Sequence, residues 1–183
     1  MNKSWSIWGQ SVKNNAKQIG SCFEENPIVL CLGTPKVLDD CLGPMVGSML
    51  KKLGYKGYVY GTLDAPICSL NLKPALAFLK ATHKNKKILI VDASTTSKVE
   101  RIGKIVLAKE YKPFNQTLYD LHVEADYFLF GVCSLHKKHF SSLYNAKMSI
   151  INKLCKTICY GLMSVCQQKQ IYKTPKIANN AKY

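Results

Sequence analysis

The sequence predicts an α/β protein, a three-layer α/β/α sandwich with a mostly parallel mixed sheet. Continuous apolar runs at Pro27–Gly33 and Lys87–Ala93 are typical of central strands that are covered on both faces. Segments with apolar residues at helical spacing separate such runs, and alternation of strands with helices is the signature of this class. The 183 residues suffice for one domain with a full hydrophobic core, which we place at residues 26–166.

The predicted elements follow one another as strand and helix units. The predicted strands are Pro27–Gly33, Tyr58–Thr62, Lys87–Ala93, Ile102–Ala108 and Asp126–Val132. The predicted helices begin at Leu42, near Lys73 and near Lys138, and the last of them is the longest and ends at Cys166. Gly54 is a typical C-terminal stop for the first helix. Pro74 lies in the first turn of the second helix, where its missing N–H costs no hydrogen bond.

The two ends of the chain do not fit this pattern. Residues 1–25 form an irregular amphipathic stretch, which we expect to be an N-terminal arm or a docked helix, and residues 167–183 predict a basic, disordered tail. No secretory signal precedes the domain, and no apolar run approaches the roughly 20 residues of a membrane span. We therefore expect a cytoplasmic protein that does not contact a membrane. Its eight cysteines should then be reduced.

The charge balance of the chain is strongly basic. Lys and Arg number 26 against 11 Asp and Glu, which gives a net charge of +15 and favours anionic partners such as DNA or an acidic protein. The lysines lie in short clusters without an Arg-rich or aromatic-interleaved nucleic-acid motif, so a solvated surface also explains them. Neither G-x-G-x-x-G nor the P-loop motif is present, and we predict no cofactor.

Two aspartates fall where predicted strands end. Asp40 lies in the loop that leaves the first strand and Asp92 closes the third, so parallel pairing would bring both to one edge of the sheet. Two nearby carboxylates cannot both ionise cheaply, and such a pair can activate water and protonate a leaving group. With an added histidine, His122 or His136, the pair would suit a divalent metal. Alternatively, Asp39 or Asp40 caps the helix that follows, and Asp92 accepts hydrogen bonds from loop amides.

Several motifs are specific enough to compare with a known family. They are IVLCLGT (Ile28–Thr34), DCLGPMVG (Asp40–Gly47), VYGTLDAP (Val59–Pro66), ILIVDA (Ile88–Ala93) and LYNAKMSIINKL (Leu143–Leu154). Together they resemble the YyaC-like sporulation protein family of spore-forming Firmicutes, and the resemblance covers Pro27–Val165. That family is similar to the spore germination protease and, more distantly, to hydrogenase-maturation endopeptidases. The resemblance implies their phosphorylase/hydrolase-like α/β/α fold.

The resemblance also implies a function and a site. The germination protease has one catalytic aspartate in a D-A-L-G-P motif and a second in a V-D-A motif, which correspond to Asp40 and Asp92 of this chain. It implies a cytoplasmic or forespore peptidase that hydrolyses a protein or peptide substrate with this pair, and it leaves open which aspartate activates the water. Asp39 is then a supporting neighbour, and Asp64 is a further candidate for shaping the site. In the hydrogenase-maturation enzymes the equivalent pair binds nickel with a histidine; here we assign no metal ligand.

The alternative function is a non-catalytic sporulation protein that keeps the fold and binds DNA or an acidic protein through its basic surface. A close approach of Asp40 and Asp92 would favour the enzyme. A contiguous lysine face with steep salt dependence would favour the binding protein.

Overall fold

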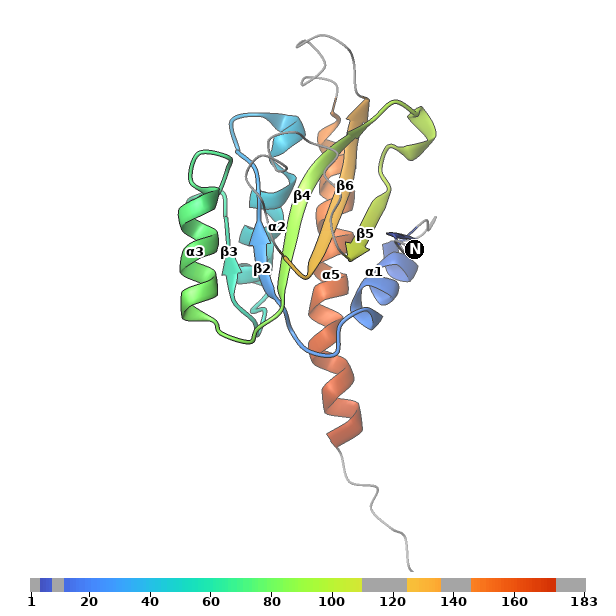
Figure 1. The fold of residues 1–183 in the computed structure, drawn as a ribbon. Coiled ribbons are helices and arrows are strands. Elements are labelled where there is room, and N and C mark those ends of the chain that lie inside the picture. The colour runs from blue at the N-terminus through green and yellow to red at the C-terminus, as the bar shows by residue number, and fades with distance from the viewer. Residues whose placement is uncertain (1–3, 8–11, 110–124, 136–145, 174–183) are drawn as a thin grey trace, which may run out of the picture.

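The computed structural model describes residues 4–7, 12–109, 125–135 and 146–173 (Figure 1). Its strands are β1 (Ser4–Ile7), β2 (Ile28–Cys31), β3 (Val59–Tyr60), β4 (Ile88–Thr96), β5 (Ile105–Lys109) and β6 (Tyr127–Leu135). Its α-helices are α1 (Val12–Ser21), α2 (Leu42–Lys52), α3 (Leu72–Thr82) and α5 (Met148–Lys173). Two short 3-10 helices are η1 (Leu38–Asp40) and η2 (Val99–Arg101).

The sheet is mixed, with the order β1-β5-β6-β4-β2-β3. Strands β3, β2, β4 and β6 run parallel, and β5 and β1 add an antiparallel edge. Two apolar clusters fill the space on the two faces of the sheet, one beneath α1, α2 and α5 and the other beneath α3. Figure 1 shows α3 in front of the sheet and α2 and α5 behind it. The predicted α/β/α sandwich with a mostly parallel mixed sheet is confirmed.

The connection that leaves β2 leads through α2 to β3 on one side of the β2/β4 pair, and the connection that leaves β4 leads through η2 to β5 on the other side. The chain therefore reverses its direction across the sheet between β2 and β4. In open α/β sheets such a reversal opens a crevice outside the carboxyl ends of the two strands, because the connections that leave them lead away from each other. This is the place where the fold positions a site.

The N-terminal stretch contributes both a strand and a helix. Strand β1, which the sequence does not predict, pairs antiparallel with β5, and α1 packs against α5. Ile19 of α1 is fully buried, and a Cβ built on Gly161 of α5 would lie 2.6 Å from the Ile19 Cβ. The glycine thus permits a close approach of the two helices.

The final helix differs from its predicted limits. The prediction that residues 167–183 are disordered is wrong for residues 167–173, because α5 continues to Lys173. These residues are Gln, Lys, Ile and Tyr, which allow helix propagation, and no Gly or Pro interrupts it before Pro175. The helix begins at Met148 instead of near Lys138, and residues 136–145 and 174–183 lie outside the described ranges.

Two cysteines of α5 belong to the hydrophobic core. Cys155 and Cys159 are buried on one face of α5, within the cluster beneath α2.

Within the described ranges, no helix is long and apolar enough to cross a membrane.

Candidate active site

The candidate site lies at the carboxyl end of β2, beside the part of β4 that extends beyond it. The last residue pair between β2 and β4 is Cys31 with Val91, and Asp92 is the next residue of β4. The sequence predicts that Asp92 closes its strand, but β4 runs on to Thr96 beside β6. Asp92 therefore lies inside a strand, at the level where the loop leaving β2 begins.

Asp40 is held in that loop by the chain folding back on itself. The Thr34 N–H donates to both the backbone oxygen and the Oδ2 atom of Asp40, each at 3.0 Å. Gly33 has φ +129, and a Cβ built on it would lie 2.0 Å from the Asp40 backbone oxygen. Only a residue without a side chain fits there, so Gly33 fixes the approach of Asp40 to the end of β2.

The charge of Asp40 acts on the carboxyl group of Asp92. The pKa of Asp92 is raised to about 7, mainly by burial and in smaller part by the negative charge of Asp40. A hydrogen bond of 2.7 Å from the Ala93 N–H lowers the pKa and partly offsets these two effects. Burial is also the main cause that raises the pKa of Asp40, and the Thr34 N–H partly offsets it. Asp40 therefore lies near enough to Asp92 for its charge to act on that carboxyl.

Asp39 lies against this pair, in the interior. It is 4% exposed, and the Ser134 hydroxyl of β6 donates to its Oδ2 at 3.1 Å. Its Oδ1 is buried and has no hydrogen-bond partner within the described ranges. Burial raises the pKa of Asp39, while hydrogen bonds from Ser134 and Ala146 lower it. Its charge in turn contributes to the raised pKa of Asp40.

Ser134 is a site residue that sequence reasoning missed. The register of β4 against β6 shifts between Ser94 and Thr95, so Cys133 is an extra residue on β6 and forms a bulge. The bulge follows the level of Asp92 and sets the direction of the Ser134 hydroxyl. No local sequence signal marks a bulge of this kind.

The alternative in which an aspartate caps the following helix is wrong. The N-cap residue of α2 is Cys41, and no side chain caps it.

The thiol of Cys41 is not activated as a nucleophile. It donates a hydrogen bond to the Leu38 oxygen at 3.1 Å, and burial raises its pKa.

Asp64 is not brought into the pair. It is exposed in the loop after β3, where Thr62 closes the turn by hydrogen bonds with Ala65 and the Leu63 N–H donates to Ser48. The Asp64 carboxylate takes no part in these bonds. The expectation that it shapes the site remains untested.

The histidines do not complete a metal site among the described side chains. His83 follows α3 at the amino ends of the strands, where its Nε2 lies 2.7 Å from the Tyr60 hydroxyl. His122, His136 and His139 lie outside the described ranges. Where the structure is described, no group of three His, Cys, Asp or Glu is placed to hold a metal ion.

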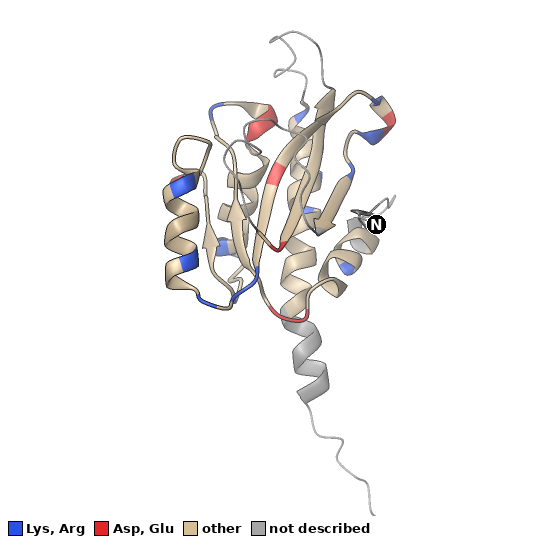
Figure 2. Cartoon of the chain, viewed as in Figure 1, with Lys and Arg blue, Asp and Glu red and all other residues tan. Residues whose placement is uncertain are grey.

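Acidic residues thus gather at one end of the sheet. Figure 2 shows those of η1 and β4 in the upper half of the molecule, around the carboxyl ends of β2 and β4. This is the crevice position that the reversal between these strands creates.

Comparison with known proteins assigns the chain to a family. The family described as "Protein of unknown function (DUF1256)" matches residues 3–161. The chain belongs to this family. Among curated proteins, the chain is 28% identical over 138 residues to "Uncharacterized protein YyaC" of Bacillus subtilis (strain 168), which covers 74% of this chain and 67% of that protein. The predicted resemblance to YyaC-like proteins is confirmed.

A solved structure shares the fold of this DUF1256 member. It is the crystal structure of the [NiFe] hydrogenase maturation protease HycI from Thermococcus kodakarensis KOD1, with a TM-score of 0.50 and 14% sequence identity. The match covers 78% of this chain and 94% of that one. At this identity the likeness is one of fold, and it agrees with the fold that the resemblance implies.

Proposed function

We propose that this protein is an aspartate-dependent endopeptidase in which Asp40 and Asp92 form the carboxylate pair. The observation that carries the proposal is the position of the two carboxyls at the reversal point of the sheet, Asp92 one residue beyond the last β2–β4 pair and Asp40 held against the end of β2 by Thr34 and Gly33. A surface pair would ionise fully at neutral pH, whereas this pair holds one proton near neutrality because Asp92 is half-buried beside Asp40. One ionised and one protonated carboxyl is the arrangement that peptide hydrolysis requires.

The surroundings of the two groups suggest their roles. The Thr34 N–H stabilises the Asp40 carboxylate, so Asp40 carries the charge and accepts a proton from the attacking water. Asp92 has the higher pKa and carries the shared proton. As the water oxygen bonds to the peptide carbon, Asp92 donates its proton to the amide nitrogen. The C–N bond breaks, the amine leaves with that proton, and the proton that Asp40 took from the water restores the single proton of the pair.

The substrate in this proposal is an extended protein or peptide segment. The fold that the chain shares with a maturation protease supports a proteolytic role. We further propose that the protein acts in sporulation, in the cytoplasm or forespore.

The test is a cleavage assay on a peptide library, read by mass spectrometry. We expect the wild-type protein to cut a subset of peptides, and Asp40→Asn and Asp92→Asn each to reduce the rate by about a hundredfold or more. Glu24→Gln is the matched control, because Glu24 is an exposed carboxylate at the opposite end of the sheet. Cleavage that persists in both aspartate variants would contradict the proposal. Absence of cleavage by the wild-type protein would favour the non-catalytic alternative.

A further inference from the structure

A line of four aromatic rings occupies the edge of the sheet at β3, away from the aspartates. The rings of Tyr58 and His83 lie 4.1 Å apart, those of Tyr60 and His83 5.8 Å apart, and those of Tyr60 and Phe78 6.1 Å apart. The residues come from β3, from α3 and from the segments beside them, so their proximity results from folding and is not visible as a sequence motif.

Two of these rings are more exposed than a structural role requires. The contact between Tyr60 and His83 joins β3 to the end of α3 through a hydrogen bond of 2.7 Å. Tyr58 is 54% exposed and Phe78 is 53% exposed, so each presents much of its ring to solvent. Exposed aromatic side chains that are grouped in space commonly mark a binding surface.

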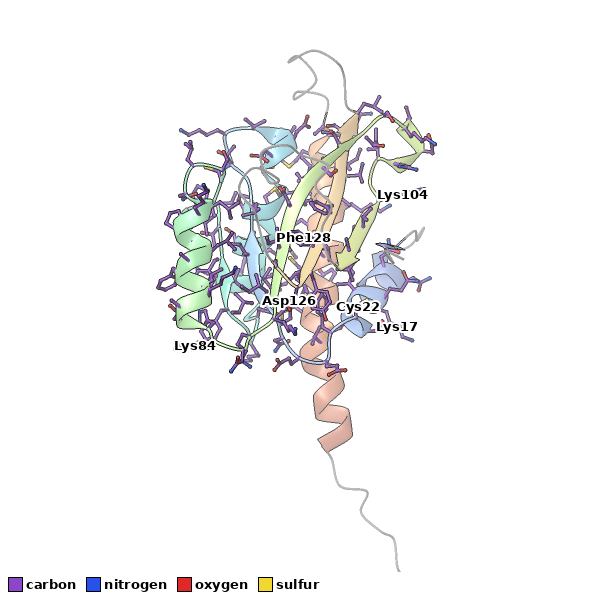
Figure 3. The ribbon with its side chains drawn as sticks, in the orientation of Figure 1. Lys17, Cys22, Lys84, Lys104, Asp126 and Phe128 are labelled. Carbon is purple, nitrogen blue, oxygen red and sulfur yellow. The ribbon has the colours of Figure 1, made fainter. Side chains whose placement is uncertain are left out.

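Lysines surround the rings. Two neighbouring hollows share Lys86; Lys56 and Tyr58 line the first, and Lys80, His83 and Lys84 line the second. Figure 2 shows the link between α3 and β4 as a blue run at the lower left, and Figure 3 places Lys84 at the lower end of α3.

The positive charge of this edge is only partly neutralised. Lys86 pairs with Glu25 at 3.2 Å and Lys87 with Asp126 at 2.7 Å, and all four side chains remain substantially exposed. Such pairs are weak and exchange readily with another anion. Lys56 and Lys84 have no ion pair with any described residue.

We propose that this lysine–aromatic edge, formed by Lys56, Tyr58, Tyr60, Phe78, Lys80, His83, Lys84 and Lys86, binds a single-stranded polynucleotide. Lysines attract the phosphates, and exposed rings offer faces on which unpaired bases stack. A duplex keeps its base faces stacked on one another, and an acidic polypeptide uses the lysines but leaves the rings unused. The chemistry of the edge therefore favours a single strand over both.

The test is fluorescence anisotropy with labelled single strands of about 12 nucleotides, oligo-dT and oligo-U, to distinguish DNA from RNA. We expect the double variant Lys56→Glu/Lys84→Glu to weaken binding about tenfold or more and to flatten the salt dependence. The matched control is Lys98→Glu/Lys153→Glu, which changes two exposed lysines, one beside η2 and one in α5, by the same total charge. This control should bind within about twofold of the wild type, because neither lysine belongs to the edge and salt screens the remaining long-range effect of charge.

The contribution of the rings is tested separately. We expect Tyr58→Ala to weaken binding at least about fivefold and Tyr58→Phe to retain it, since stacking needs the ring and not the hydroxyl. Equal losses in the two lysine double variants would overturn the proposal, because they would show that only net charge matters. Tighter binding of a duplex or of poly-glutamate than of either single strand would also overturn it.

Discussion

Asp92 is a carboxyl group whose ionisation works against the stability of the fold. Its pKa rises from 3.8 to about 7 because it is buried beside Asp40. The folded protein therefore binds a proton on Asp92 more tightly than the unfolded chain does, and the free energy of unfolding falls as pH rises between these two values. Below the unfolded pKa both states are protonated and the cost is absent; above the folded pKa the cost is fully present.

Replacing Asp92 with Asn should remove this cost. The Asn side chain keeps an oxygen for the Ala93 N–H and cannot ionise. We expect Asp92→Asn to raise the free energy of unfolding at about pH 8, with an upper bound of about 4 kcal/mol, and to change it little at about pH 3. Urea denaturation at the two pH values measures the difference. A stabilisation of the same size at both would show that ionisation of Asp92 is not its cause.

At the scale of the elements, the site depends on how the loop after β2 meets the strand end. Gly33 has a positive φ and lies against the Asp40 backbone, whereas Gly54 has a positive φ of +72 with nothing within 4 Å of its Cβ position. We expect Gly33→Ala to lower the free energy of unfolding by about 3 kcal/mol or more, because strain and a steric clash add. Gly54→Ala, with strain alone, should cost about 1 kcal/mol.

Thermal denaturation of the two glycine variants measures these costs. Both positions have a positive φ, so the difference between the two costs measures the close approach together with the larger strain at the φ of +129. Equal costs at Gly33 and Gly54 would mean that the loop moves freely away from β2, and the position of Asp40 would then not be fixed by Gly33.

The elements with strong local signals could be predicted from the sequence. Strand β2 is a continuous apolar run, and α3 carries Pro74 in its first turn. The polar end of β4, Ser94–Thr96, has no such signal; it forms a strand because β6 pairs with it. Strand β1 has four residues, and its partner β5 lies about a hundred residues away in the sequence, so local propensity could not reveal it.

Some contacts of the candidate site could likewise be predicted from the sequence, and others could not. Asp40 and Asp92 could be predicted as neighbours because parallel strands end at one edge of a sheet. The contact between Asp39 and Ser134 could not, because it depends on the bulge at Cys133.

At the scale of the whole molecule, the N-terminal helix packs as part of the same core as the site. Ile19 is 0% exposed between α1 and α5. We expect Ile19→Ala to lower the free energy of unfolding by about 2–5 kcal/mol in one cooperative transition, because a cavity opens in the shared core. Lys17→Ala, on the exposed side of α1, should change it by less than about 0.5 kcal/mol.

Circular dichroism during urea denaturation measures both helix variants. A separate early transition in Ile19→Ala, with the main transition unchanged, would show that α1 docks without supporting the domain.

The two proposed sites lie at different ends of the sheet. Aspartates gather at the carboxyl ends of β2 and β4, and lysines gather at the amino end of β4 and the adjoining end of α3. The two proposed sites are therefore spatially separate, and variants at one should leave the other unchanged.

The most direct test of the central claim, that Asp40 and Asp92 form one coupled carboxylate pair, is an NMR titration of the Asp92 carboxyl carbon in the wild-type protein and in Asp40→Asn. We predict that Asp92 titrates at about 7 in the wild type. In Asp40→Asn it should titrate lower, because the neighbouring charge is gone. An Asp92 that titrates near 3.8, or that titrates identically in both proteins, would contradict the account.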